Sequence, residues 1–120
     1  MNPSPLRVAV IGAGLIGSRR AQIILESGGG VLAGAADTDA SRAELLARKT
    51  GCRHYAHYQE ALGNPAVDAV IVATTNDALA TVTIAALNAG KHVLCEKPPG
   101  RSAEEARAMA EAAACAGRRL

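Results

Sequence analysis

Residues 7–17 of the chain read RVAVIGAGLIG, and this stretch decides the fold. Four consecutive apolar residues, 8–11, lack the polar alternation of a half-exposed strand, which is typical of a parallel strand covered on both faces. In the G-x-G-x-x-G motif that follows, Gly12 allows a sharp turn off the strand, Gly14 allows an anion to approach the backbone, and Gly17 allows close helix packing. The free amides and positive dipole end of the next helix would then face a diphosphate.

The segment after the motif supplies the context that a lone glycine motif lacks. Residues 19–26 form a plausible helix, three glycines at 28–30 end it, and residues 31–36 form a second apolar strand. Asp37 closes this strand 20 positions after Gly17, where a dinucleotide-binding fold places the carboxylate that binds the adenosine ribose. The alternative is that Asp37 only caps the next helix and that Gly14 only makes a turn. The combined order of strand, loop, helix, strand and acid favours the nucleotide site.

Composition limits the classes of protein that the chain can represent. Its 120 residues make one domain, 1–120, and 49% hydrophobic residues without Phe or Trp predict an aliphatic core. A net charge of +2 gives no argument for nucleic acid or a membrane, and we expect the arginine pairs at 19–20 and 118–119 to be solvated surface. Three cysteines without metal-type spacing predict no metal site. We see no secretory leader or membrane span, and we expect a reduced, cytoplasmic protein.

The rest of the chain alternates between strand and helix patterns. We predict strands over residues 53–55, 67–73 and 92–95, helices over residues 40–49, 58–62 and 78–89, and a last helix from a capping box at Ser102 and Glu105 to Gly117. This alternation predicts an α/β fold, a doubly wound parallel sheet of the Rossmann type. Such sheets bind ligands beyond the carboxyl ends of their strands, so four strand exits should meet at one crevice: residues 12–17, Asp37, residues 73–76 and residues 96–98.

The motifs resemble those of the Gfo/Idh/MocA oxidoreductases, in the N-terminal half of that family. The resemblance rests on VIGAGLIG at 10–17, Asp37 at the end of the second strand, VDAVIVAT at 67–74 and AGKHVLCEKP at 89–98. It covers nearly the whole chain. The E-K-P after a G-K-H-V-L strand is its most discriminating part, because many Rossmann enzymes share only the glycine motif.

The resemblance implies an NAD(P) site built from these strand exits. In it Gly12, Gly14, Leu15 and Ile16 hold the diphosphate, Asp37 holds the adenosine ribose, Thr74 and Asn76 lie toward the nicotinamide ribose, and Glu96 and Lys97 lie beside the nicotinamide. Lys97 also takes the family's catalytic role: it faces the substrate and assists proton transfer or orientation at the carbon that gives up hydride. The alternative for Lys97 is an ordinary loop lysine. NAD is favoured because Asp37 would repel a 2′-phosphate, although Arg42 leaves NADP possible.

The chain departs from the family pattern after the fourth strand. Thr75 replaces the usual proline, and Leu79 stands where a histidine is usual. These two changes leave open the shape of the loop and one contact on the cofactor or substrate side.

Members of the family are also longer than this chain. The resemblance implies a sixth strand, begun at residues 118–120, and then a second, substrate-binding domain that is absent here. We therefore expect a fragment of a homo-oligomeric oxidoreductase that transfers hydride between nicotinamide and a sugar- or polyol-like substrate, and we expect these residues alone to bind weakly and not turn over. The alternative is a non-catalytic dinucleotide-sensing module. Lys97 favours the enzyme, while Leu79 and the missing half favour the sensor.

Overall fold

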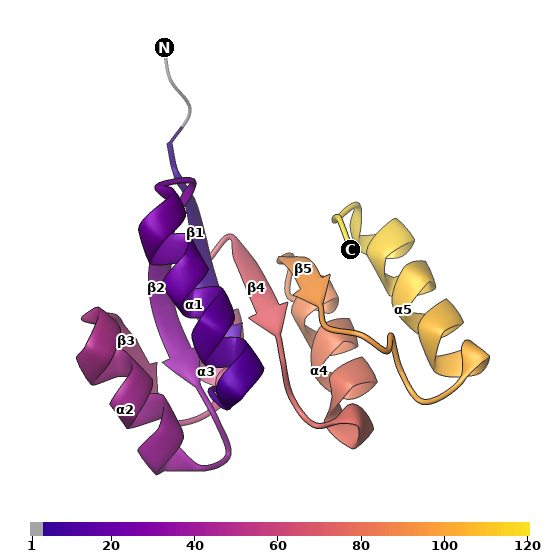
Figure 1. Ribbon diagram of the computed structural model, residues 1–120. Helices are drawn as coiled ribbons and strands as arrows, with labels where there is room; N and C mark the ends of the chain where they lie inside the picture. The colour runs from indigo at the N-terminus through magenta and orange to yellow at the C-terminus, as the bar shows by residue number, and fades with distance from the viewer. Residues whose placement is uncertain (1–3) are drawn as a thin grey trace.

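The computed structural model describes residues 4–120 and consists of five strands and five helices in alternation (Figure 1). In chain order these are β1 (Leu6–Ile11), α1 (Leu15–Ser27), β2 (Gly30–Ala36), α2 (Ala40–Thr50), β3 (Arg53–Tyr55), α3 (Tyr58–Gly63), β4 (Ala69–Val72), α4 (Asn76–Asn88), β5 (His92–Cys95) and α5 (Ala103–Ala116). The order confirms the α/β alternation that the sequence predicts.

The strands form one parallel sheet in the order β3-β2-β1-β4-β5. β1 lies at the centre, where Val10 pairs with Ala35 of β2 on one side and with Ile71 of β4 on the other. The chain moves outward from β1 in one direction through β2 and β3 and in the other through β4 and β5, which is the doubly wound arrangement. The switch point therefore lies between β1 and β4, and in open α/β sheets this is where ligands bind.

Two aliphatic layers hold the helices onto the two faces of the sheet. Ala21 of α1 and Leu46 of α2 pack with the β1 and β2 side chains on one face. Leu79 and Leu87 of α4 pack on the other face, together with residues of α3 and α5. Figure 1 shows α1 and α2 in front of the sheet and α4 behind it. The expectation of a mainly aliphatic core is confirmed, with Tyr55 as the single large aromatic side chain buried in the described residues.

Three local details differ from the expectations. α1 begins at Leu15 instead of residue 19, so that Gly17 lies inside its first turn, and α4 begins at Asn76 instead of residue 78. Ser102 accepts a hydrogen bond from the Glu105 amide (3.1 Å) as a capping box requires, but the Glu105 carboxylate accepts from the amide of Arg101 (2.6 Å), one residue before the cap. At both earlier starts the N-cap residue, Gly14 or Thr75, has an extended backbone and makes no capping hydrogen bond through a side chain, so no capping side chain marks these starts in the sequence.

Residues 118–120 form no strand in this structure, although their backbone lies along β5. The amide of Val93 donates to the carbonyl of Arg119 (2.9 Å), and the amide of Arg119 donates to Nδ1 of His92 (3.0 Å). A sixth strand at this position remains a prediction. Arg118 is exposed as expected, and its Nε donates to the carbonyl of Gly90 (2.7 Å).

Candidate functional site

The first and third glycines of the motif at residues 12–17 are required by the backbone around them. Gly12 has a φ of +98°, and a Cβ at this position would overlap the carbonyl of Ala73 at the exit of β4. A Cβ at Gly17 would overlap the carbonyl of Gly12. The turn off β1 and the close approach of α1 to that turn therefore depend on these two residues, as the sequence predicts.

Gly14 is different, because the protein itself leaves the space beside it open. Its φ of −75° is accessible to any residue, and an added Cβ would meet only Nη1 of Arg42, at 3.7 Å. Gly14 is also the N-cap of α1, whose first turn contains no acidic side chain. The first-turn amides of a helix have no partner inside the helix and carry its positive dipole end. The position therefore fits a phosphate group that approaches the bare backbone.

Asp37 lies on the same rim as Gly14 and is bonded to the glycine loop. Its Oδ2 accepts from the amide of Ala13 (2.7 Å), and its Oδ1 accepts from the amide of Asp39 (2.8 Å). Each carboxylate oxygen keeps a further lone pair with which it can accept from a ribose hydroxyl. The alternative is that Asp37 only caps the next helix. That cap is instead Asp39, whose side chain accepts from the amide of Ser41 (3.1 Å) at the start of α2.

A cleft of about 380 Å³ opens at this rim, beyond the carboxyl ends of β1, β2, β3 and β4. This volume lies within the usual range for small-molecule sites. The predicted residues that line it are Gly12, Gly14, Asp37 and Thr74. The exit of β3 also lines it, through His57, Tyr58 and Gln59, which sequence reasoning missed. The rule about the carboxyl ends of parallel strands could have found these residues if β3, with only three residues, had been counted as a full member of the sheet.

Three further predicted residues lie close by but do not line the cleft. Leu15 and Ile16 lie in the first turn of α1 and are exposed. Because their side chains are apolar, only their backbone amides can bind a diphosphate as predicted. Asn76 is exposed as the first residue of α4. The assignment of all three to a cofactor stays a prediction.

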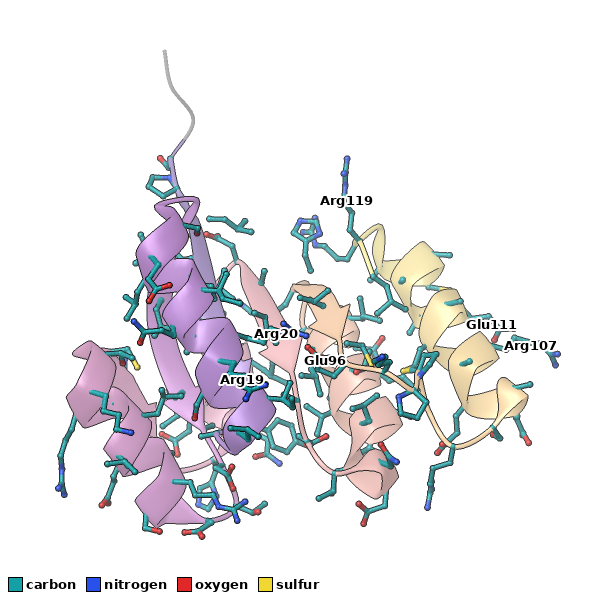
Figure 2. The ribbon with its side chains drawn as sticks, viewed as in Figure 1. Arg19, Arg20, Glu96, Arg107, Glu111 and Arg119 are labelled. Atoms are coloured by element: carbon teal, nitrogen blue, oxygen red, sulfur yellow. The ribbon has the colours of Figure 1, made fainter. Side chains whose placement is uncertain are left out.

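The exit of β5 does not line the cleft either, and it is tied to α1 instead. The carboxylate of Glu96 accepts from Nε of Arg20 in a partly buried ion pair, and the two side chains point toward one another in Figure 2. Arg20 is therefore not simply solvated surface, as we expected from the sequence, whereas Arg19 beside it is exposed. The hydrogen bond from Arg20 is the main reason that the pKa of Glu96 lies below its usual value. Lys97 is exposed next to this pair.

The two departures from the family pattern have separate structural outcomes. Thr75 is the N-cap of α4 and lines the cleft. Leu79 is 1% exposed and belongs to the core cluster between α4 and the sheet. At the position where the family pattern has a histidine, the side chain therefore contributes to packing and offers no polar group to the cleft.

The glycine loop, the open face at Gly14 and the carboxylate of Asp37 at one rim define a dinucleotide-binding Rossmann domain. The model of the GFO_IDH_MocA oxidoreductase family, NAD-binding Rossmann fold, matches residues 6–120. The chain therefore belongs to the Gfo/Idh/MocA oxidoreductases as an NAD-binding Rossmann domain.

Two curated relatives and one solved structure illustrate the similarity. 1,5-Anhydro-D-fructose reductase of Ensifer adhaerens is 39% identical over 112 residues, which are 92% of this chain and 34% of that protein. Inositol 2-dehydrogenase 3 of Saccharopolyspora erythraea is 36% identical over 118 residues, 96% of this chain and 34% of that protein. The crystal structure of GenD2 from gentamicin A biosynthesis in complex with NAD has a TM-score of 0.92 at 32% identity and covers 97% of this chain and 33% of that chain.

The chain thus spans about a third of the length of the curated relatives it matches. Within residues 4–120, no helix combines the length and the apolar character needed to cross a bilayer. The same residues contain no group of three or more His, Cys, Asp or Glu side chains that could hold a metal ion.

Proposed function

We propose that this chain is the cofactor-binding part of an NAD-dependent oxidoreductase that acts on a hydroxyl group of a sugar- or polyol-like substrate. The observation that carries the proposal is the meeting of three features at one cleft: the N-terminus of α1, the open face of Gly14 and the carboxylate of Asp37. The relatives named as an anhydrofructose reductase and an inositol dehydrogenase support this substrate class.

The residues of this site divide between the two ends of the cofactor. The amides at residues 12–16 hold the diphosphate, and Asp37 accepts from the adenosine ribose. Thr74 and Asn76 lie toward the nicotinamide ribose, and Glu96 toward the nicotinamide itself. Nicotinamide supplies the hydride chemistry when it is bound. Lys97 accepts the proton of the substrate hydroxyl as the hydride leaves the same carbon, and it returns this proton in the reverse direction.

Steady-state turnover of the complete gene product tests this proposal. With NAD and a panel of polyols and sugars, we expect nicotinamide reduction that falls at least about 100-fold in Lys97→Met, because a general acid–base group contributes about that much. NAD affinity should stay within about two-fold, a range too small to account for that loss. Lys49→Met, which removes an exposed lysine at the end of α2, is the matched control and should leave turnover unchanged. Unchanged turnover in Lys97→Met would contradict the role of Lys97.

Residues 1–120 by themselves should bind NAD weakly and show no turnover. The described residues include nothing that closes over the substrate side of the site and excludes water. Dehydrogenase activity of this chain alone would contradict this expectation.

A second function, a non-catalytic dinucleotide sensor, is favoured by one observation. Leu79 is buried in the core, so that the cleft lacks the polar side chain expected from the family pattern. A sensor would bind NAD or NADH without turning over any member of the substrate panel. The same experiments therefore distinguish the two functions, because they measure NAD affinity and turnover separately.

The choice between NAD and NADP depends on two side chains at the adenosine end. The carboxylate of Asp37 repels a 2′-phosphate, whereas the guanidinium of Arg42, which lines the same cleft, attracts one. We propose a preference for NAD with measurable NADP binding, and calorimetry with both cofactors tests it. We also propose a homo-oligomeric protein in the cytoplasm; the three cysteines are free, which suits a reducing compartment.

A further inference from the structure

The exit of β5 is held by contacts with two different elements. The backbone amide of Glu96 donates to the carbonyl of Val72 (3.0 Å) and thereby extends the pairing of β5 with β4 by one residue. The side chain of Glu96 reaches α1 on the front face of the sheet, where it accepts from Nε of Arg20 (Figure 2). Glu96 is thus fixed at its backbone by the sheet and at its carboxylate by a helix.

The ion pair between Arg20 and Glu96 is better protected than the other ion pairs of the described residues. The Glu96 side chain is 17% exposed, whereas the acidic partner in each of the other three pairs is 26% to 51% exposed. The partners are 76 residues apart in sequence, whereas two of the other three pairs join residues three or four positions apart at the start of a helix. A partly buried pair between distant residues links two elements, whereas an exposed pair between near neighbours in sequence contributes little.

Lys97, directly after Glu96, has a different environment. Its side chain is exposed, and it makes no side-chain hydrogen bond or ion pair within residues 4–120. The neighbouring carboxylate of Glu96 is hydrogen-bonded to Arg20, and its charge interaction with Lys97 is a lesser cause of its lowered pKa. The loop continues through Pro98, whose carbonyl accepts from the amide of Gly100 (2.8 Å). Glu96, which directly precedes Lys97, therefore contacts both a strand and a helix.

We propose that Arg20 is a positioning residue: it holds Glu96 against α1 and thereby fixes the place of Lys97 relative to the dinucleotide cleft. The connection is direct, since α1 begins at the glycine loop and Arg20 lies only five residues after its first residue, Leu15. One rigid helix thus presents its N-terminus to the diphosphate and its second turn to the loop that carries Lys97. The consequence for turnover rests on the proposed function, because it assigns proton transfer to Lys97.

The charge of Arg20 is what the test must isolate, and the chain offers a matched control. Arg20→Met keeps much of the aliphatic stem and removes the guanidinium, whereas Arg20→Lys keeps a cation that can still reach Glu96. Arg19→Met removes the neighbouring exposed arginine of the same helix (Figure 2). Glu96→Gln removes the charge on the other side of the pair. Far-UV circular dichroism and thermal unfolding identify any variant that fails to fold, and if Arg20→Met fails, Glu96→Gln carries the exchange test.

The first measurement is hydrogen exchange at the amides of Glu96 and Gly100, which are hydrogen-bonded to the carbonyls of Val72 and Pro98; it does not depend on any activity. Arg20→Met should raise exchange at these amides about ten-fold, Arg20→Lys should restore most of the protection, and Arg19→Met should leave it unchanged. If the exchange rates in Arg20→Met equal those of the wild-type protein, the proposed positioning role is wrong.

The second measurement is steady-state turnover of the complete gene product. Loss of positioning should lower kcat about 10- to 100-fold in Arg20→Met while KM for NAD stays within about two-fold, since small displacements of a catalytic group cost this much. In the exchange measurement, the double variant Arg20→Met/Glu96→Gln should exchange at Gly100 no faster than Arg20→Met alone, because both changes break the same contact. Raised exchange with unchanged kcat overturns the positioning role. An unaltered protein without any turnover contradicts the proposed function instead, and the exchange measurement still decides whether Arg20 holds the loop.

Discussion

The parallel strands have their amino ends at one side of the sheet, the amino edge, and their carboxyl ends at the other, the carboxyl edge. The charged residues at these two edges are used in opposite ways. At the amino edge, Arg7 binds Asp68 through both carboxylate oxygens (2.9 Å each), and the buried ammonium of Lys91 donates to the carbonyls of Asn64 (2.8 Å) and Val67 (2.6 Å). At the carboxyl edge, the first-turn amides of α1 have no hydrogen-bond acceptor inside the helix. The ammonium of Lys97 is exposed. The charged groups at the amino edge are bonded within the protein, whereas the first-turn amides of α1 and the ammonium of Lys97 at the carboxyl edge remain available to a ligand.

The comparison also shows that size does not identify the site. The amino edge has a hollow of about 850 Å³, lined by residues that include Arg7, Asp68 and Lys91. The cleft at the carboxyl edge is smaller, about 380 Å³. The larger hollow contains charges that already have partners within the protein, and the smaller one contains the open backbone of Gly14. The available chemistry, and not the volume, assigns the function to the carboxyl edge.

The largest expected effect separates two glycines of the same loop. Gly17→Val should prevent folding, because its Cβ would overlap the carbonyl of Gly12, and such overlaps have no flexible neighbour that can yield. Gly14→Val should fold, with unfolding free energy within about 1 kcal/mol of the unaltered protein, but should weaken NAD binding about 100-fold or more. Circular dichroism, urea unfolding and calorimetry measure these outcomes. NAD binding by a folded Gly14→Val variant at full affinity would contradict the diphosphate site.

The next effect concerns the amino edge alone. Lys91→Met should lower the free energy of unfolding by about 2 kcal/mol, because two carbonyls lose a charged donor, while relief of the buried charge offsets part of the loss. NAD affinity should stay within about two-fold, since Lys91 lies at the opposite edge from the cleft. Urea unfolding and calorimetry on the same preparation compare the two quantities. A large loss of NAD affinity at unchanged stability would break the division between the edges.

At the carboxyl edge, removal of one carboxylate should change cofactor choice more than stability. Asp37→Asn should weaken NAD binding about ten-fold and narrow the preference for NAD over NADP, because the neutral amide no longer repels a 2′-phosphate. Glu44→Gln is the control, since Glu44 is exposed on α2 and does not line the cleft. Calorimetry with both cofactors measures the ratio. An unchanged ratio in Asp37→Asn would show that this carboxylate does not contact the ribose.

The features that could be predicted from the sequence are those that depend on local backbone geometry. The strand-turn-helix at residues 7–17 needs Gly12 and Gly17 for reasons of sterics, and the apolar runs at β1, β2 and β4 predict buried parallel strands. The placement of Asp37 beside the loop follows from the parallel pairing of β1 and β2. These steps use only neighbouring residues and the geometry of one crossover.

The contacts that could not be predicted depend on how distant elements sit in space. The pairing of Arg20 with Glu96 requires the rotation of α1 about its axis and the position of β5 in the sheet, and neither is encoded near Arg20. The burial of Leu79 likewise depends on which side of α4 faces the sheet. The sequence therefore shows which residues these are, but their contacts depend on how the helices and strands pack together.

The smallest expected effect is the acid sensitivity of the amino edge. The hydrogen bond from the Arg7 side chain, followed by that from its amide, lowers the pKa of Asp68 to about 2. A carboxylate with a lowered pKa in the folded state stabilises the protein above its unfolded pKa, and this contribution is lost as the pH falls from about 4 toward about 2. Because both side chains are partly exposed, the pair should contribute no more than about 1 kcal/mol.

Asp68→Asn makes this contribution measurable against the other carboxylates of the protein. The unfolding free energies of the two proteins should differ by up to about 1 kcal/mol near pH 6. They should converge as the pH falls toward about 2, because protonation then removes from Asp68 the charge that the Asp68→Asn variant never carries. Arg7→Met combined with Asp68→Asn should add little to either single change, since the two residues share one interaction. A difference that stays constant from about pH 6 to about pH 2 would mean that Asp68 acts through packing or its amide contact alone. The amino edge would then be held by neutral hydrogen bonds, and the contrast between the two edges would rest on Lys91.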